Sequence, residues 1–152
     1  MPLDKIDLSI LREVQQNARI SMTELARRVG LSKTPVTQRV QAMEKSGVIA
    51  AYRAVLSPRK LGLSHVTYME VRLLDTTEAA LRRFNDAVRQ IAEVEECYMI
   101  AGNFDYLLKV RSRDITHFRT IMGDQISALP GVASTSSFVA MEAVIENAEI
   151  EV

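Results

Sequence analysis

The sequence lacks three features that would each place a chain in a particular class of protein. Its 152 residues contain one cysteine, Cys97, so no internal disulfide can form and we expect a reducing compartment, the cytoplasm. No stretch approaches the roughly 18 apolar residues that a membrane span needs. Charged residues interrupt the first 30 positions, so we expect no signal peptide and no membrane partner.

The chain also has no net charge, with 19 Lys and Arg against 19 Asp and Glu. That balance argues against a nucleic-acid binder, which normally carries a basic surplus. The total hides a division, because residues 1–60 hold eleven basic and five acidic residues, or +6. Residues 61–152 hold eight and fourteen, or −6. A basic third and an acidic remainder predict two domains with different partners.

The first 50 residues have the pattern of three short helices. Apolar residues recur every four positions over residues 4–17, which is typical of an amphipathic helix. Ser21 and Glu24 predict a capping box at the start of a second helix, and Gly30 predicts its left-handed end. A third helix is expected from Ser32, after a turn too short for parallel packing. This is helix-turn-helix geometry.

The third helix has one apolar and one polar face. Val36, Val40 and Met43 share the inward side at helical spacing. Hydroxyl and amide side chains on the other side can read base edges in the major groove of double-stranded DNA. The predicted base-reading residues are Thr34, Thr37, Gln38 and Gln41. The residues predicted to contact phosphate are Ser32, Lys33, Arg39, Arg27, Arg28, Lys45 and Arg53. The alternative, a solvated helix face, usually carries a mixture of Glu and Lys, whereas Glu44 is the one acid between Lys33 and Lys45.

A boundary follows this helical region. Residues 48–56 are apolar and β-prone, and predict a short strand. Residues 57–63, which include Pro58 and Gly62, are interpreted as a linker. We therefore expect a DNA-binding domain over residues 1–56 and a second domain over residues 64–152.

The second domain alternates strands with helices in the order β-α-β-β-α-β. This order is the ferredoxin-like arrangement, so the whole chain is expected to be α+β, with a winged-helix-like helix-turn-helix domain before an αβ sandwich. The expected strands are residues 65–74, 94–101, 106–111 and 132–144. One helix is expected to be capped by Asp75, and another by Ser112 or Asp114 with Ile115 facing inward.

Helices in this arrangement cover one face of the sheet. Apolar residues are also expected on the other face, namely Val66, Tyr68 and, depending on the register, Cys97, Met99 and Val139. A second apolar face predicts a homodimer through this domain.

Several motifs resemble those of the Lrp/AsnC family of transcription regulators. They are the stretch Leu25–Val36, then Arg39-Val40, Glu44, Gly47-Val48-Ile49, Tyr52–Leu56, the turn Gly102–Tyr106 and Leu129–Val132. The resemblance implies a DNA-reading N-terminal domain and a C-terminal domain that dimerises and senses amino acids. It also implies assembly of dimers into octamers, with effector sites where dimers meet.

The resemblance places the effector in the turn between the second and third strands. The residues carried over are Gly102, Asn103, Phe104, Asp105 and Tyr106, and Asp105 can receive an α-ammonium group. The polar run Ser134, Thr135 and Ser136 is a second candidate lining for a small-molecule effector. The alternatives are that the turn residues only shape a hairpin, that the serines are strand-edge chemistry, and that the protein has no ligand.

No residues are placed for catalysis. His65 and His117 lack Cys or acidic partners at ligand spacing, so we expect no metal and no cofactor. The chain has neither a phosphate-binding glycine loop nor a nucleophile elbow, so it is not expected to be an enzyme. The prediction is a sequence-specific transcriptional regulator whose operator binding and oligomeric state respond to an amino acid. The alternatives are an architectural DNA-wrapping protein and an amino-acid-binding regulatory subunit.

Overall fold

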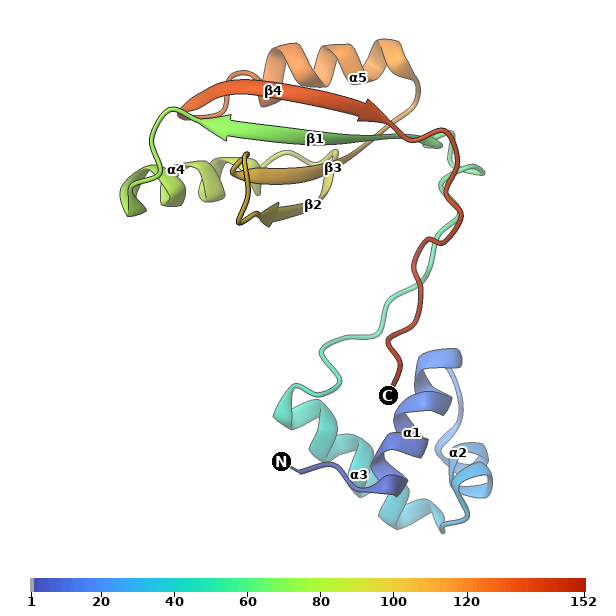
Figure 1. The fold of residues 1–152 in the computed structure, drawn as a ribbon. Coiled ribbons are helices and arrows are strands. Elements are labelled where there is room, and N and C mark those ends of the chain that lie inside the picture. Colours follow the sequence, from blue (N-terminus) through green and yellow to red (C-terminus); the bar gives the residue numbers. More distant parts are fainter. Residues whose placement is uncertain (1) are drawn as a thin grey trace. The chain divides into compact units, whose positions relative to one another are not determined.

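The structure is a computed structural model that describes residues 2–152. It forms two compact units (Figure 1). The head comprises residues up to Leu56 together with Ile145–Val152, and the body comprises Ser57–Val144. Each unit has its own hydrophobic core.

The head contains the three expected helices. They are α1 (Lys5–Gln16), α2 (Met22–Val29) and α3 (Lys33–Ser46). Their apolar faces form one small core made of Ile10, Val14, Ile20, Leu25, Ala26, Val36, Val40 and Met43. Burial of these side chains, at about 25 cal/mol per Å² of apolar surface, is what holds three helices too short to be stable alone.

The helix caps in the head differ in one respect from expectation. The Ser21 hydroxyl accepts the Glu24 backbone N–H at 3.1 Å, as predicted. The Glu24 carboxylate does not return to Ser21, because it binds two arginines instead, so half of the predicted capping box is wrong. A complete box lies at α1, where Asp4 and Asp7 each accept the other's backbone N–H.

Residues 48–56 form no strand, so that expectation is wrong. A β-prone segment becomes a strand when a neighbour supplies ladder hydrogen bonds, and none of the described segments pairs with this one. Several of its side chains consequently stay exposed, including Tyr52 (48 %) and Val55 (78 %).

The head is completed by a distant segment of the chain. The Arg12 Nε of α1 donates a hydrogen bond to the Val152 carbonyl at 2.6 Å. One turn further along, the Gln15 amide donates to the Ile150 carbonyl at 2.8 Å. Residues from the two ends of the described sequence therefore share one unit.

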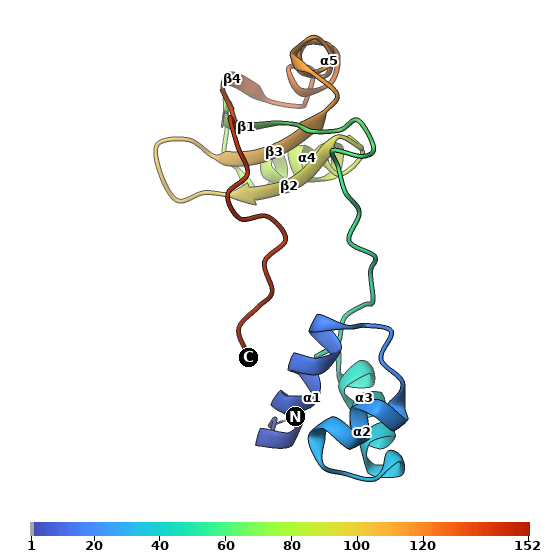
Figure 2. The same ribbon diagram turned by 90° about the vertical axis from the view of Figure 1, so that its right-hand side faces the viewer.

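The body has the expected β-α-β-β-α-β order. Its elements are β1 (His65–Leu73), α4 (Glu78–Val88), β2 (Val94–Met99), β3 (Tyr106–Ser112), α5 (Ile115–Ile121), the π-helical turn η1 (Met122–Ile126) and β4 (Val132–Val139). The strands lie in the order β2-β3-β1-β4, with antiparallel neighbours. Helices α4 and α5 cover one face of this sheet (Figures 1 and 2). The body's core lies between that face and the helices, and Phe84, Leu108 and Val110 are fully buried in it.

Three boundaries in the body differ from expectation. Helix α4 is capped by Thr77 rather than Asp75, because the Asp75 carboxylate binds Thr77 and shifts the start of the helix. Strand β4 ends at Val139 rather than residue 144, since β1 begins at His65 and offers no partner beyond Ala140, whose N–H reaches Val66. Ile115, expected to face inward, is 51 % exposed because it occupies the first turn of α5.

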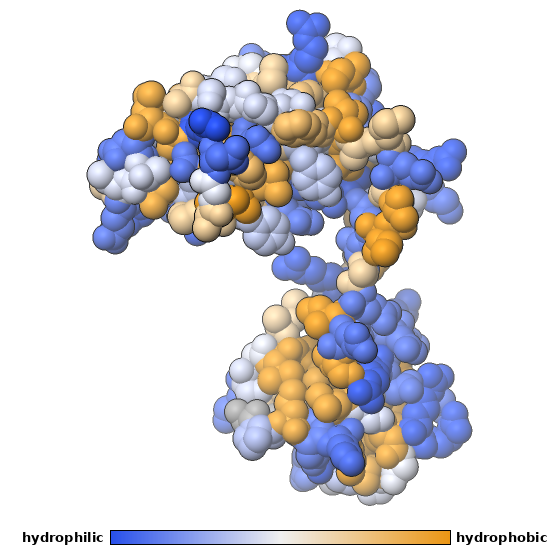
Figure 3. Space-filling view, in the orientation of Figure 1, coloured by the Kyte–Doolittle hydropathy of each residue, from blue (hydrophilic) through white to orange (hydrophobic). Residues whose placement is uncertain are grey.

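The sheet register decides which residues lie on the face that lacks helices. Tyr68 pairs with Phe138, and Tyr98 pairs with Leu107. The apolar residues on this open face are Val66, Tyr68, Tyr98, Leu107 and Phe138. Cys97, Met99 and Val139 belong to the opposite, helix-facing rows, so the conditional placement of those three is wrong. Apolar and charged residues both reach the surface of the body (Figure 3).

Candidate nucleic-acid interface and effector site

A turn of three residues, Gly30 to Ser32, joins α2 to α3. Gly30 adopts the left-handed conformation with φ of 71°, which glycine accepts without steric cost. The Leu31 N–H closes the end of α2 by donating to the Ala26 carbonyl at 3.0 Å. Helix α3 then begins at Lys33, with Pro35 in its first turn. The backbone thus forms the predicted helix-turn-helix.

The polar face of α3 points away from the core. Thr34, Gln38 and Gln41 are exposed. Neither glutamine amide forms a hydrogen bond with any residue in the described part of the chain, so both retain their donors and acceptors for an external partner. Thr37 is half-buried, and its hydroxyl donates to the Lys33 carbonyl at 2.8 Å. Three of the four predicted base readers are therefore fully available.

The predicted phosphate-contacting residues fall into two groups. Lys33, Lys45 and Arg53 are exposed and form no ion pair within residues 2–152. Ser32 is exposed at the N-cap of α3, where its hydroxyl makes no capping hydrogen bond. The hydroxyl and the first N–H groups of α3 can therefore both bind an anion.

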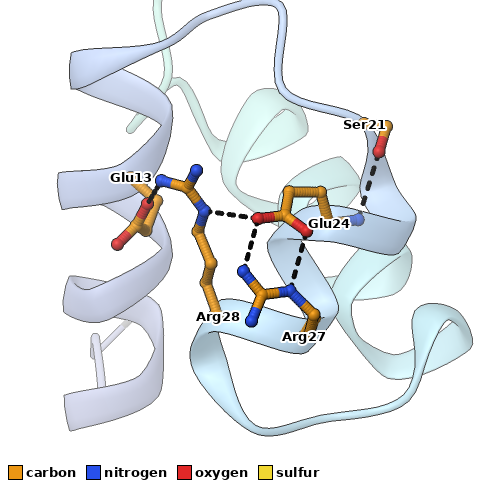
Figure 4. Close-up of polar contacts among 5 residues, drawn as sticks. All are labelled: Glu13, Ser21, Glu24, Arg27 and Arg28. Atoms are coloured by element: carbon orange, nitrogen blue, oxygen red, sulfur yellow. Dashed lines mark hydrogen bonds and ion pairs between the residues drawn. The ribbon is translucent and has the colours of Figure 1, made fainter.

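Arg27 and Arg28 belong to the second group, because both bind Glu24 (Figure 4). Arg27 is held by both carboxylate oxygens, at 2.7 and 2.8 Å, and Arg28 also reaches Glu13 of α1 at 2.8 Å. The hydrogen bonds from Arg27 and then Arg28 lower the pKa of Glu24 from its ordinary 4.5 to about 2. The cluster joins α2 to α1 at the surface and leaves Arg27 71 % exposed.

Arg39 is the third paired arginine, and it turns toward α1. Its Nη1 lies 2.8 Å from Asp4 Oδ2 and 2.7 Å from Asp7 Oδ1. Sequence reasoning missed these two aspartates as functional candidates. The available signal was the Asp-x-x-Asp spacing at the start of α1, which is that of a capping box.

The predicted effector turn lies in the loop between β2 and β3. The backbone N–H of Asp105 donates to the Val71 carbonyl at 2.9 Å, and its own carbonyl accepts from Ile100 at 2.8 Å. Its carboxylate accepts the Leu73 N–H at 2.7 Å. Asp105 thus ties the loop to β1 through its backbone N–H and the Oδ2 atom of its carboxylate.

The other turn residues differ in exposure. Gly102 and Asn103 are exposed, and Phe104 is half-buried. Tyr106 is a core residue, 2 % exposed, whose ring packs on Phe84 with centroids 4.3 Å apart. Its hydroxyl donates to Asn85 Oδ1 at 2.7 Å.

The structure does not bring the serine run directly beside the turn. Thr135 of β4 and Tyr106 of β3 both pair with Val71, so the strand β1 separates them. Ser134 and Ser136 lie on the open face, and Thr135 lies on the helix-facing side. Two open hollows, of about 540 Å³ in the head and about 360 Å³ beside α4 and β2, are lined by other residues.

Among residues 2–152, none of the helices combines the length and the apolar character of a membrane span. No group of His, Cys, Asp and Glu in the described chain is arranged to hold a metal ion. His65 instead contacts Ser112 at 2.9 Å, and His117 Nδ1 accepts the Arg113 N–H.

Two family profiles match the chain. The profile of a winged helix-turn-helix DNA-binding domain matches residues 3–50, and the profile of the Lrp/AsnC ligand binding domain matches residues 66–150. Together they cover the three helices of the head and the sheet of the body from Val66 onward.

Full-length relatives agree with these profiles. A proline dehydrogenase transcriptional activator of Rhodobacter capsulatus is 67 % identical over 95 % of this chain and 94 % of its own. A leucine-responsive regulatory protein of Escherichia coli K12 is 42 % identical over 93 % of this chain and 87 % of its own.

Solved structures share the fold. An AsnC family transcriptional regulator from Agrobacterium tumefaciens matches with a TM-score of 0.93 and 33 % identity, over 97 % of this chain and 96 % of that one. A transcriptional regulator from Neisseria meningitidis in complex with L-Met matches with a TM-score of 0.90 and 30 % identity, over 95 % and 94 %.

Proposed function

Because the chain belongs to the Lrp/AsnC family of DNA-binding transcriptional regulators, we propose that it reads an operator through α3 and answers to proline. It is a regulator rather than an enzyme, and its two domains bind DNA and an amino-acid effector. The choice of proline comes from the relative that is 67 % identical and is named an activator of proline dehydrogenase. A second such activator, from Rhizobium radiobacter, is 53 % identical over 95 % of this chain. A proline dehydrogenase gene is accordingly the first candidate target.

The observation that carries DNA reading is the unpaired polar face of α3. Thr34, Gln38 and Gln41 are exposed, and Thr37 lies on its flank. Amides and hydroxyls there can pair with adenine and other base edges. Ser32, Lys33, Lys45 and Arg53 surround this face and supply phosphate contacts, with Arg27 as a further candidate because most of its side chain is exposed.

The proposed effector site is the 102–106 turn together with Ser134, Thr135 and Ser136. The turn offers exposed groups at Gly102 and Asn103, and the serines present hydroxyls on a nearby strand. In a single chain these groups are separated by β1. We therefore propose that a second copy completes the site.

The proposed oligomer is a homodimer through the open face of the sheet, with dimers assembling to an octamer. Tyr68, Tyr98 and Phe138 support it, because they are 39 %, 57 % and 53 % exposed on a face that no helix covers. Light scattering should give at least a dimer for the full chain. A Tyr98→Glu, Phe138→Glu variant should dissociate to monomers, since two new charges would be buried at the interface. A variant mass equal to that of the wild type would place the interface elsewhere.

We retain the functional division into residues 1–56 for DNA, 57–63 as a linker, and 64–152 for effector and assembly. We place the protein in the cytoplasm, where its DNA partner lies. Limited proteolysis should cut first within residues 57–63, and first cuts inside the sheet would contradict this division.

The deciding experiment is selection of genomic fragments by the full-length protein with and without an amino acid. L-proline, L-leucine and L-methionine are added separately at one salt concentration, because DNA affinities compare only at fixed salt. We expect enrichment of a defined operator that L-proline changes most. An enriched operator that none of the three amino acids alters would overturn the effector assignment alone.

Two outcomes would favour the other functions. Equal binding of all fragments would indicate an architectural DNA-wrapping protein. No DNA binding even at low salt would indicate an amino-acid-binding regulatory subunit.

A further inference from the structure

Arg39 lies on the recognition helix, but its side chain faces the protein rather than DNA. Its guanidinium binds two carboxylates of α1, Asp4 at 2.8 Å and Asp7 at 2.7 Å. The Asp7 side chain is 8 % exposed, and that of Arg39 is 32 % exposed. This contact crosses from the middle of α3 to the first turn of α1.

The two carboxylates are themselves held in place. Asp4 Oδ1 accepts the N–H groups of Ile6 and Asp7, both at 2.8 Å, and Asp7 Oδ2 accepts the Asp4 N–H at 3.1 Å. The hydrogen bond from Asp7 N–H, and then that from Arg39, lowers the pKa of Asp4, so this carboxylate stays ionised. Arg39 is thus anchored to a fixed helix end and not to flexible surface chains.

A phosphate contact would require Arg39 to release these partners. Release would leave the buried Asp7 charge unpaired, which is the costly half of breaking a buried ion pair. It would also bring a phosphate toward two carboxylates. Lys33 and Lys45 are exposed and face neither obstacle.

Gln38 directly precedes Arg39 in α3, and Gln41 lies two residues after Arg39. Successive residues of an α-helix are 100° apart around its axis, so holding one side chain sets the direction of the others. We propose that Arg39 is a positioning residue, which fixes the rotation of α3 against α1 and thereby decides which bases Gln38 and Gln41 reach. This inference rests on the DNA-reading role of α3, and it replaces the expectation that Arg39 binds phosphate.

The test compares three variants of the full-length protein with a matched control. They are Arg39→Gln, Arg39→Lys and Asp7→Asn, with Lys33→Gln as the control that removes an exposed cation. Binding is measured over a salt series to a duplex selected from a random library by the wild type, and to a scrambled duplex of equal length. Thermal unfolding shows that each variant is folded at the assay temperature.

We expect Arg39→Gln to lower the ratio of selected to scrambled affinity about tenfold, the size of one lost base contact, without changing the salt slope. Lys33→Gln should weaken binding to both duplexes equally. It should also make the plot of log K against log salt less steep by about 0.9. Asp7→Asn should also lower the ratio, although removing an acid should by charge alone strengthen DNA binding.

Arg39→Lys covers the case in which Arg39→Gln does not fold. It keeps the charge but replaces the planar guanidinium, whose Nη1 contacts both carboxylates, with an ammonium on a shorter side chain, so the ratio should fall to an intermediate value. The proposal is overturned if Arg39→Lys keeps the wild-type ratio, or if Arg39→Gln behaves like Lys33→Gln while Asp7→Asn strengthens both complexes. A wild-type protein that enriches no sequence would instead overturn sequence-specific reading itself.

Discussion

The two proposed ligand-contacting regions differ in how much of their polar chemistry is already used. On α3, the amides of Gln38 and Gln41 have no partner within the described chain. In the 102–106 turn, the N–H, the carbonyl and one carboxylate oxygen of Asp105 are hydrogen-bonded to the protein's own backbone. The proposed DNA-reading face thus has its side-chain amides free in a single chain, whereas the proposed effector turn has much of its polar chemistry in use.

The two regions differ because a helix and a loop satisfy their backbone hydrogen bonds in different ways. A helix satisfies its own interior N–H and C=O groups, so its outward side chains remain free. A hairpin loop has no such internal ladder and must use side chains and neighbouring strands instead. Asp105 does this for the N–H of Leu73, where the regular pairing of β1 with β3 has ended.

The largest expected effect is on operator preference, after removal of the two glutamine amides from the exposed face of α3. A Gln38→Ala, Gln41→Ala variant loses two base contacts worth about 1–3 kcal/mol each, so operator preference should fall at least thirtyfold. Binding to bulk DNA should keep its salt dependence, because the cations are untouched. Competition of operator against scrambled duplex measures the ratio, and an unchanged ratio would show that base reading lies elsewhere.

The next effect tests whether Asp105 is structural. Asp105→Ala leaves the Leu73 N–H without its acceptor, so the free energy of unfolding should fall by about 1–3 kcal/mol in urea titrations. Asp105→Asn is the matched control, because an amide oxygen can still accept that N–H. If the carboxylate also receives an ammonium group, the control should stay stable and lose the response to amino acids. A fully stable Asp105→Ala variant would contradict the structural role.

A smaller effect is expected at Tyr106. Tyr106→Phe removes the hydrogen bond to Asn85 but keeps the ring against Phe84. The free energy of unfolding should therefore fall by about 0.5–1.5 kcal/mol. An Asn85→Ala variant and the double variant complete a cycle that isolates this pair. An amino-acid response that vanished in the folded Tyr106→Phe variant would mean that the hydroxyl contacts the effector.

The smallest effect concerns the paired arginines of the head. Glu24 has its pKa lowered to about 2, first by Arg27 and then by Arg28, from an unfolded value near 4.5. Because the folded value is the lower one, its contribution to stability is complete above pH 4.5 and is lost as the pH falls toward 2. Thermal unfolding across this range should show a shallower decline in Glu24→Gln than in the wild type. Parallel curves would mean that the ion pairs of Glu24 add nothing to the stability of the head.

Local features were predictable from the sequence. The end of α2 at Gly30, the buried stripe Val36, Val40 and Met43, and the cap by Asp114, one of the two expected alternatives, each depend on residues within a few positions. Neighbours along a helix determine such features, so periodicity and cap chemistry sufficed for these three, but not for the start of α4, where Thr77 is the cap instead of Asp75.

Features that depend on distant partners were not predictable. Residues 48–56 have strand composition and lack a pairing strand among the described segments, and β4 ends opposite the start of β1. Arg39 is a cation near the proposed base-reading face. Its neighbours in the sequence do not predict that it binds carboxylates 32 and 35 residues away. At the candidate site, the unpaired glutamines could therefore be predicted from the sequence. Which arginines are paired with carboxylates could not.

The division of the head between two separate stretches of sequence has a consequence for protein synthesis. The ribosome completes all three head helices before it begins the body, and adds Ile145–Val152 only after the body is made. The three-helix core must therefore form first without the backbone carbonyls that Arg12 and Gln15 later receive. Because domains fold as units from the N-terminus onward, the nascent head depends on its own small core until residues 145–152 have been made.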